Sequence, residues 1–593
     1  MLDVRVYRAA FLPALIALFV AAFSLGDRPA PAVSPLAADA FDGQRAFGGD
    51  APLRNSLQEL ARSFPDRATG SADDAGLADR VAATLSAADR TRRPAFRVTR
   101  RHAGDAETVI GVRPGLSSRQ IVVLSHRDAY GRPGRAELSG TAVMLELARL
   151  FRARELRKTL VLVSTSGARE GYTGARAWAQ QASGGPIDAV IVLGDLAGAK
   201  SERPWVVPWS LGGGATPLAL QRTVENSVRA EGGGPGSSRA IAQWIRRAMP
   251  FTVSEQGVVA DSSLPAVMIG VSGERGPGAE ENVSRARMDR FGRSVLRAVS
   301  AIDAKGDEPA FAGSPQGIVT MRNVLPDWAV RLLVGTLLLP AFVTALDGFF
   351  RVRRRRLAVR PWMLWLLATG LPVVMGWVWL RALGLTGALH PPDAPILPPA
   401  PFHRGEAFAV ASLALVLAIG WFGVRRLILA RAGERGHPMA GSLGAATGAV
   451  LVTLAALVWV VNPYAAALLL PAAHIWLFAA APATRLRGWA GAAAVAVGLA
   501  PFAVVLLYYM RALALNPLQE AWMALLSAAS GQLSLAVAIV LGGLLACLAG
   551  LITIMRARHR VHANAEPDPV RTRGPVTYAG PGSLGGTESA LRR

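Results

Sequence analysis

The chain has 593 residues, of which 51% are hydrophobic, and its formal net charge at pH 7 is +23. This composition is too apolar for a single soluble globule and predicts a membrane protein with more than one domain. The densest basic run, RVRRRR at 351–356, adjoins an apolar segment, so its charge indicates membrane topology and no nucleic-acid partner. The single cysteine, Cys547, excludes disulfides within one chain and Cys-based zinc sites.

The first apolar run covers residues 9–26 and follows Arg5 and Arg8. Its length favours an uncleaved membrane anchor, with a cleaved signal peptide as the alternative. We therefore predict an N-terminal anchor over residues 1–26. Residues 27–327 are mixed in polarity, with Pro/Ala/Gly-rich ends, and form the predicted extracytoplasmic domain.

Inside residues 27–327, short β-branched runs alternate with amphipathic stretches. The predicted buried strands are TVIGV (108–112), QIVVLS (120–125), TLVLVST (159–165), DAVIVLG (188–194) and PAVMIGV (265–271). Because strands alternate with helices, the pattern predicts an α/β fold, a three-layer α/β/α domain with a mainly parallel sheet. Ligands of such sheets bind beyond the carboxyl ends of the strands, which is where His126 and Asp195 fall.

From residue 328 onward, apolar segments predict an all-α transmembrane domain over 328–555. The predicted spans are 328–350, 361–385, 406–424, 440–461, 463–482, 488–510 and 531–555. Arg-rich stretches at 351–356, 425–435, 484–487 and 556–560 fall in alternate loops, and the Pro-rich loop 388–401 falls on the other side. Because short cytoplasmic loops are rich in Arg, this alternation places both termini inside. The tail, 556–593, is predicted to be cytoplasmic and disordered.

Several motifs follow one another along the soluble domain. They are FPDRATGSADDAGLADRVAATL, IVVLSHRDA, SGTAVMLELARLF, TLVLVSTSGAREGYTGARAWA and VIVLGDLAG. In order and spacing this set resembles peptidase family M28, the di-zinc aminopeptidases and glutamate carboxypeptidases. The resemblance implies a zinc-aminopeptidase-like fold, and it implies two zinc ions in an active member.

The resemblance also assigns site residues. It implies that His126 of the H-x-D motif is the first zinc ligand, that Asp128 orients it, and that Asp195 is a further ligand. The domain has no counterpart of the closing His, since its second histidine, His102, precedes the first ligand.

Three further family positions are substituted. Ala136 stands where the bridging Asp is expected, and the neighbouring Glu137 is one residue late. Ala168 and Arg169 stand where the family has a general-base Glu and a ligand Glu, and Glu170 follows them. We expect Arg169 either to replace the charge of a metal by pairing with Asp128 or Asp195, or to face solvent.

These substitutions lead us to predict a catalytically degenerate domain that binds a peptide or protein partner outside the cytoplasmic membrane, with no zinc or substoichiometric zinc. One alternative is an active zinc amino- or carboxypeptidase with a remodelled single-metal site of His126, Glu137, Glu170 and Asp195. Another is a transporter with an ectodomain, although Asp347 alone among acidic residues comes close to lying within a span. The layout is similar to that of the peptidase-like subunit of the GPI transamidase, and it predicts a multi-pass protein of the plasma membrane.

Overall fold

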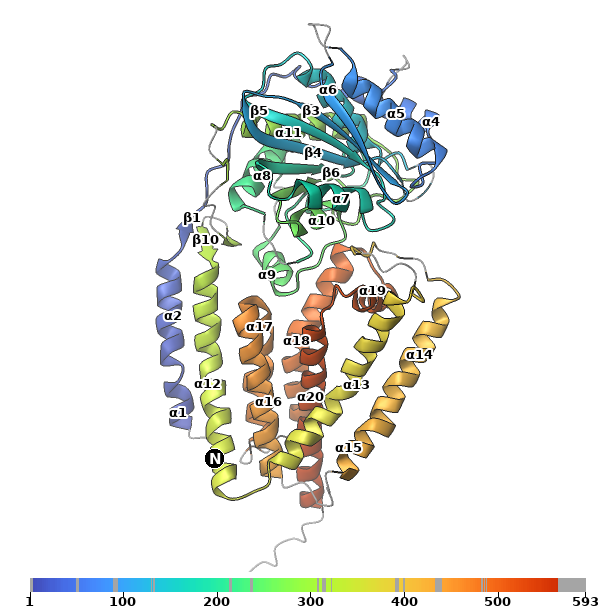
Figure 1. Ribbon diagram of the computed structural model, residues 1–593. Coiled ribbons are helices and arrows are strands. Elements are labelled where there is room, and N and C mark those ends of the chain that lie inside the picture. Colours follow the sequence, from blue (N-terminus) through green and yellow to red (C-terminus); the bar gives the residue numbers. More distant parts are fainter. Residues whose placement is uncertain are drawn as a thin grey trace, which may run out of the picture.

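The computed structural model shows an α/β domain seated on one end of a bundle of apolar helices (Figure 1). The structure describes residues 4–48, 53–88, 94–129, 131, 134–212, 216–234, 238–306, 309–311, 316–320, 323–389, 394–397, 400, 402–431, 440–481, 484, 486 and 488–563. The α/β fold predicted from the sequence is confirmed, as is the helical region.

A seven-stranded sheet forms the middle layer of the α/β domain, in the order β2-β3-β5-β4-β6-β8-β7. Its strands are β2 (Arg97–Ala103), β3 (Ala106–Arg113), β4 (Ser117–His126), β5 (Lys158–Thr165), β6 (Ile187–Leu193), β7 (Val206–Val207) and β8 (Ala266–Ile269). The four central strands β5, β4, β6 and β8 are parallel, whereas β2, β3 and β7 join antiparallel at the edges. The carboxyl ends of the central strands therefore meet at one edge of the domain.

Both faces of the sheet are covered by helices, which explains why the strands read as continuous apolar runs. On β4, Ile121 and Val123 pack into one core cluster, while Val122 and Leu124 pack into the other. The first cluster involves α3 (Gly43–Phe47), α4 (Leu57–Ser63), α5 (Ala72–Ser86), α6 (Ser139–Phe151), α8 (Leu218–Gly232) and α11 (Arg285–Asp303). The second involves α7 (Thr173–Ala182) and α10 (Glu255–Asp261). The domain thus has three layers.

The described part of the chain contains seven helices that are long and apolar enough to cross a membrane. They are α12 (Asp327–Arg354), α13 (Arg360–Leu385), α14 (Glu406–Ala418) continued by η1 (Ile419–Val424) and α15 (Arg425–Arg431), α16 (Ala440–Val461), α17 (Pro463–Ala480), α18 (Gly488–Ala512) and α20 (Leu535–Ala563). All seven predicted apolar segments therefore correspond to helices.

Two further features of the bundle differ from the prediction. A short helix, α19 (Pro517–Ser530), lies between α18 and α20 at the end that faces the α/β domain (Figure 1). It begins with a capping box in which Asn516 and Gln519 bond each other's backbone. In addition, α20 continues to Ala563, so the first residues of the predicted tail are helical, and the rest of that tail lies outside the described residues.

The N-terminal apolar run forms two helices, α1 (Val4–Ala9) and α2 (Leu12–Phe23), which pack along α12. A proline, Pro13, lies in the first turn of α2, where a missing N–H is tolerated. The hydroxyl of Tyr7 lies 2.9 Å from Nδ1 of His474 on α17, whose Nε2 lies 3.0 Å from the Leu337 carbonyl oxygen. His474 thus makes hydrogen bonds that join the N-terminal segment to the bundle.

A small antiparallel sheet marks the place where the chain enters and leaves the α/β domain. Its strands are β1 (Gly26–Asp27), β10 (Asn323–Pro326) and β9 (Gly317–Val319), in that order. Gly26 pairs with Val324 and Asp27 with Asn323, so the segments that follow α2 and precede α12 run side by side.

The helix α9 (Ala240–Ala248) carries the main contact between the α/β domain and the bundle. Its Arg246 is buried, forms an ion pair with Glu274, and donates from Nε to the Tyr508 hydroxyl of α18 at 3.0 Å. The Tyr509 ring lies 4.8 Å from the same guanidinium. The next residue, Arg247, pairs with Asp327 of α12 at 2.9 Å. Arg246 and Arg247 therefore attach the α/β domain to two helices of the bundle, α18 and α12.

Candidate functional site

All the family-site positions lie at the carboxyl edge of the central sheet. His126 ends β4, the turn 166–172 follows β5, and Asp195 follows β6. The turn before α6 brings Ala136 and Glu137 to the same place. His126, Glu137, Glu170 and Asp195 line one cavity of about 900 Å³, together with Arg169. The position that the sequence predicted for His126 and Asp195, at the carboxyl ends of the strands, agrees with this edge.

His126 is held by a carboxylate that the sequence analysis did not identify. Its Nδ1 lies 3.1 Å from Oε2 of Glu255, the first residue of α10, and Oε1 of Glu255 accepts a hydrogen bond of 2.7 Å from Thr165. Both the His126 and the Glu255 side chains are shielded, being 12% and 2% exposed. Glu255 therefore occupies the role of orienting carboxylate that the resemblance implied for Asp128.

The ion pair determines the charge of His126. Burial alone would lower the pKa of His126, but the hydrogen bond and charge of Glu255, with smaller contributions from Asp128 and Glu137, raise this pKa to about 9. The imidazole is therefore protonated at neutral pH. A metal at Nε2 would have to displace a proton, and a carboxylate on the other ring nitrogen, as Glu255 is on Nδ1, is also the usual neighbour of a metal-bound histidine.

Asp128 lies behind the cavity, and its Oδ2 accepts hydrogen bonds from the Ala168 N–H at 2.7 Å and from the Thr69 hydroxyl at 3.1 Å. Thr69 also contacts Oε2 of Glu170 at 2.7 Å. Burial raises the pKa of Asp128 to about 6, although His126 and the Ala168 N–H act in the opposite direction. Through these hydrogen bonds Asp128 stabilises the turn that carries Ala168 and links it to Thr69.

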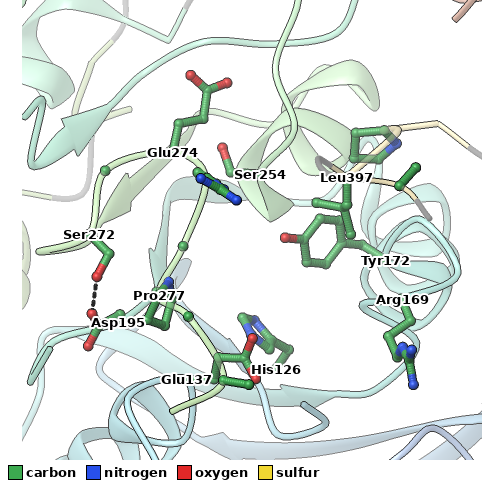
Figure 2. A pocket seen from close by; sticks show the side chains of 18 of the residues that line it. His126, Glu137, Arg169, Tyr172, Asp195, Ser254, Ser272, Glu274, Pro277 and Leu397 are labelled. Carbon is green, nitrogen blue, oxygen red and sulfur yellow. Dashed lines mark hydrogen bonds between the residues drawn. The ribbon is translucent and has the colours of Figure 1, made fainter. Parts of the chain in front are cut away.

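Asp195 is engaged by four donors from its own domain. Its Oδ1 accepts from the backbone N–H groups of Ala197 and Gly198 at 2.8 and 2.7 Å and from Ser139 at 3.3 Å. Its Oδ2 accepts from Ser272, the bond drawn in Figure 2. Burial raises the pKa of Asp195, while these four hydrogen bonds oppose the shift. The carboxylate is therefore fixed in a hydrogen-bonded turn.

The expected pairing of Arg169 with Asp128 or Asp195 is wrong. Arg169 is exposed, and no ion pair joins it to either carboxylate in the described part of the chain. In Figure 2 its guanidinium points away from His126 and Asp195. The physical reason is that Asp195 already has four hydrogen-bond donors, while Asp128 accepts two hydrogen bonds on Oδ2 and lies in the positive field of His126 and Arg127.

The remaining substituted positions are small and buried. Ala136 and Ala168 are each 1% exposed, so neither methyl group leaves room for a carboxylate without rearrangement. Glu137 is buried beside the cavity and contributes negative charge to the surroundings of His126. His102, the second histidine of the domain, lies exposed on the edge strand β2 and does not line the cavity.

The donor set does not fit a zinc pair or the single-metal site. Within the described ranges, no group of three or more His, Cys, Asp or Glu side chains is arranged to hold a metal ion. The reasons are the saturation of Asp195 by four donors and the absence of a ligand atom at Ala136, Ala168 and Arg169. His126, Glu137, Glu170 and Asp195 share the cavity but do not converge on one point.

Part of the chain that contains most of the site is similar to a known protein family. Residues 108–235 match the model of peptidase family M28. The match covers His126, Asp128, Asp195 and the three substituted positions, but it ends before Glu255. No curated protein matches the chain.

Among solved structures, the M28-like domain is similar in fold to zinc-dependent and related proteins. The LapA aminopeptidase of Legionella pneumophila has 12% identity and a TM-score of 0.35, covering 45% of this chain and 75% of that one. The zinc aminopeptidase BSAP of Bacillus subtilis has 16% identity and a TM-score of 0.28, covering 35% and 52%. The glutaminyl cyclase of Fimbriiglobus ruber has 15% identity and a TM-score of 0.31, covering 46% and 99%.

The bundle supplies one wall of the same cavity. Pro395, Ile396, Leu397 and Ala400 come from the connection between α13 and α14, and Leu526 comes from α19. Leu397 packs against the core of the M28-like domain and against the core of the bundle end. Figure 2 shows it beside Tyr172, whose ring also contacts His126 edge-to-face with centroids 5.9 Å apart. The cavity is therefore built jointly by both parts of the chain.

Proposed function

We propose that this protein is a membrane-anchored M28-like protein whose domain binds a peptide or protein partner in the cavity without hydrolysing it. The single observation that carries this proposal is that, among the described residues, no three His, Cys, Asp or Glu side chains are grouped to hold a metal ion. A hydrolase of this family type needs metals to polarise the scissile carbonyl and to generate hydroxide. The cavity retains the position, size and polar lining of a ligand site.

We also propose that the M28-like domain is extracytoplasmic and that both termini are cytoplasmic in the plasma membrane. The Arg-rich ends of α12 and α20, and the basic helix α15, lie at the end of the bundle remote from the M28-like domain (Figure 1). Short cytoplasmic loops carry such an excess of Arg. Both the N-terminal α1 and the end of α20 lie at this remote end, which agrees with an even number of crossings.

Metal analysis of the purified full chain tests the proposed function. We expect less than one zinc ion per chain and no chelator-sensitive release of amino acids from short peptides, while labelled peptides still bind. Stoichiometric zinc together with hydrolysis that is abolished in His126→Ala would contradict this and favour an active amino- or carboxypeptidase. Peptide binding should decrease in Tyr172→Ala, because Tyr172 lines the cavity.

A further inference from the structure

The cavity has two chemically different walls. Seven carboxylate side chains line it within the described residues, against three Lys or Arg side chains and two His. The carboxylates are Glu137, Glu170, Asp195, Glu202, Glu274, Glu281 and Glu406, and the Lys and Arg side chains are Arg169, Lys200 and Arg275. Glu274 is already neutralised by Arg246, which leaves six carboxylates, and these still exceed the three Lys or Arg side chains when His126 is also counted as protonated. A ligand of complementary charge is cationic.

The carboxylates come from several separate segments. Glu170 and Glu202 lie exposed on the turn after β5 and near the segment before β7, while Glu406 begins α14 in the bundle. Negative groups thus surround the space from both the M28-like domain and the helices. A ligand with several positive groups along a chain matches this distribution better than a lipid head group, which carries its charge at one point.

Apart from His403 and Glu406, the side of the cavity that the bundle supplies is apolar. Ile396 and Leu526 are buried, at 5% and 4% exposure, and they belong to the core cluster at the domain-facing end of the bundle. The helix α19, which carries Leu526, lies on this end of the bundle (Figure 1). A ligand in the cavity therefore lies directly at the end of the helices, where a polypeptide leaves the hydrocarbon region.

Resting on the proposed function, we propose that the cavity binds a Lys/Arg-bearing segment of another membrane protein at the point where that segment leaves the bilayer. The positive side chains meet the carboxylates of the M28-like domain, and the adjoining apolar residues meet the wall of Ile396, Leu397 and Leu526. The partner's own membrane span keeps it close to the cavity, because anchoring both molecules in one bilayer raises their effective concentration.

The test uses the full chain in phosphatidylcholine nanodiscs and three labelled synthetic peptides. The first joins an apolar span of about 20 residues to a Lys/Arg-rich segment. The second has the same span joined to a Glu-rich segment, which controls for the anchoring. The third is the Lys/Arg-rich segment without a span. Binding is measured by energy transfer to a donor on the M28-like domain, at low and at high salt.

We expect the first peptide to bind best and its affinity to fall at high salt. The double variant Glu170→Gln/Glu202→Gln should weaken it about tenfold, as expected for two lost charge pairs. The matched control Glu155→Gln, an exposed carboxylate before β5 that does not line the cavity, should leave binding unchanged.

Equal binding of the two anchored peptides would overturn the inference, because charge would then play no part. Binding of the soluble peptide as tightly as the anchored one would also overturn it, but would leave peptide binding in the cavity intact. Displacement of the first peptide by phosphatidylethanolamine in the nanodisc would overturn it in favour of a lipid ligand. If no peptide binds, the proposed function fails together with the inference.

Discussion

The substitution Glu255→Gln removes the negative charge of this side chain and keeps its shape. Gln has nearly the same volume and still offers an oxygen to Thr165, but it removes the negative charge beside His126. The His126 pKa of about 9 lies above its unfolded value of about 6.5, so the pair contributes stability that is fully present below pH 6.5. This contribution is lost as the pH rises through about 9.

The size of the effect follows from the shift in pKa. One unit corresponds to about 1.4 kcal/mol, so the raised pKa of His126 is worth on the order of 3 kcal/mol at pH 6. For a domain of this size, 1 kcal/mol shifts the melting temperature by about 2 °C. We therefore expect Glu255→Gln to melt about 6 °C below the wild type at pH 6, and the difference to shrink strongly by pH 9.5.

The assay is thermal unfolding of the full chain in nanodiscs, followed by tryptophan fluorescence at pH 6, 7.5 and 9.5. Trp178 of α7 and Trp209 lie in or against the core on the same face of the sheet as Glu255 and report on it. Glu155→Gln is the control, since it removes an exposed carboxylate far from His126. A melting difference between wild type and Glu255→Gln that is the same at pH 6 and pH 9.5 would refute the reasoning.

Three further predictions concern other parts of the molecule. Arg246→Leu should weaken the attachment of the M28-like domain to the bundle by about 3–5 kcal/mol, because it leaves Glu274 buried without its cation. The measurement is limited proteolysis, in which the domain should be released faster than from the wild type. Arg169→Leu should change stability by less than about 0.5 kcal/mol, since the side chain is exposed; a drop of several degrees in melting temperature would indicate a hidden ion pair. In a Cys547→Ala background, Arg354→Cys should react with membrane-impermeant thiol reagents only after the cells are opened, and labelling of intact cells would reverse the proposed topology.

Most helices and strands could be predicted from the sequence, because an element that is buried on both faces requires a continuous run of apolar residues. The strands β4 and β6 carry runs of Ile, Val and Leu, and the spans carry runs of about 20 apolar residues. The helix α19 was missed because, at 14 residues, it is too short to read as a membrane span, and its first turn contains polar residues. Its existence depends on the Asn516 capping box and on packing against the bundle end.

The site could be predicted only in part, because local motifs do not indicate which residues distant in the sequence contact one another. The positions of His126 and Asp195 follow from the ends of strands, which the sequence marks. Glu255 is an isolated acidic residue 129 positions further along, and nothing in its neighbourhood indicates that it reaches His126. The direction of Arg169 likewise depends on the backbone of a turn in which Tyr172 adopts a left-handed conformation, with φ of 60°.

The pairing of β1 with β10 also determines the order in which this protein can be assembled. In the proposed topology, α2 enters the membrane first, but α12 and the His474 partner of Tyr7 are made only after the whole M28-like domain. At about 5–20 residues per second, the ribosome needs about 15–60 s to produce the roughly 300 intervening residues. For that interval the first helix has no bundle to join, so lipid or the insertion machinery must accommodate it. Pairing of β1 with β10 is therefore a late event, because β10 is made only after the whole M28-like domain. When it forms, this pairing brings the chain back beside the segment that follows α2.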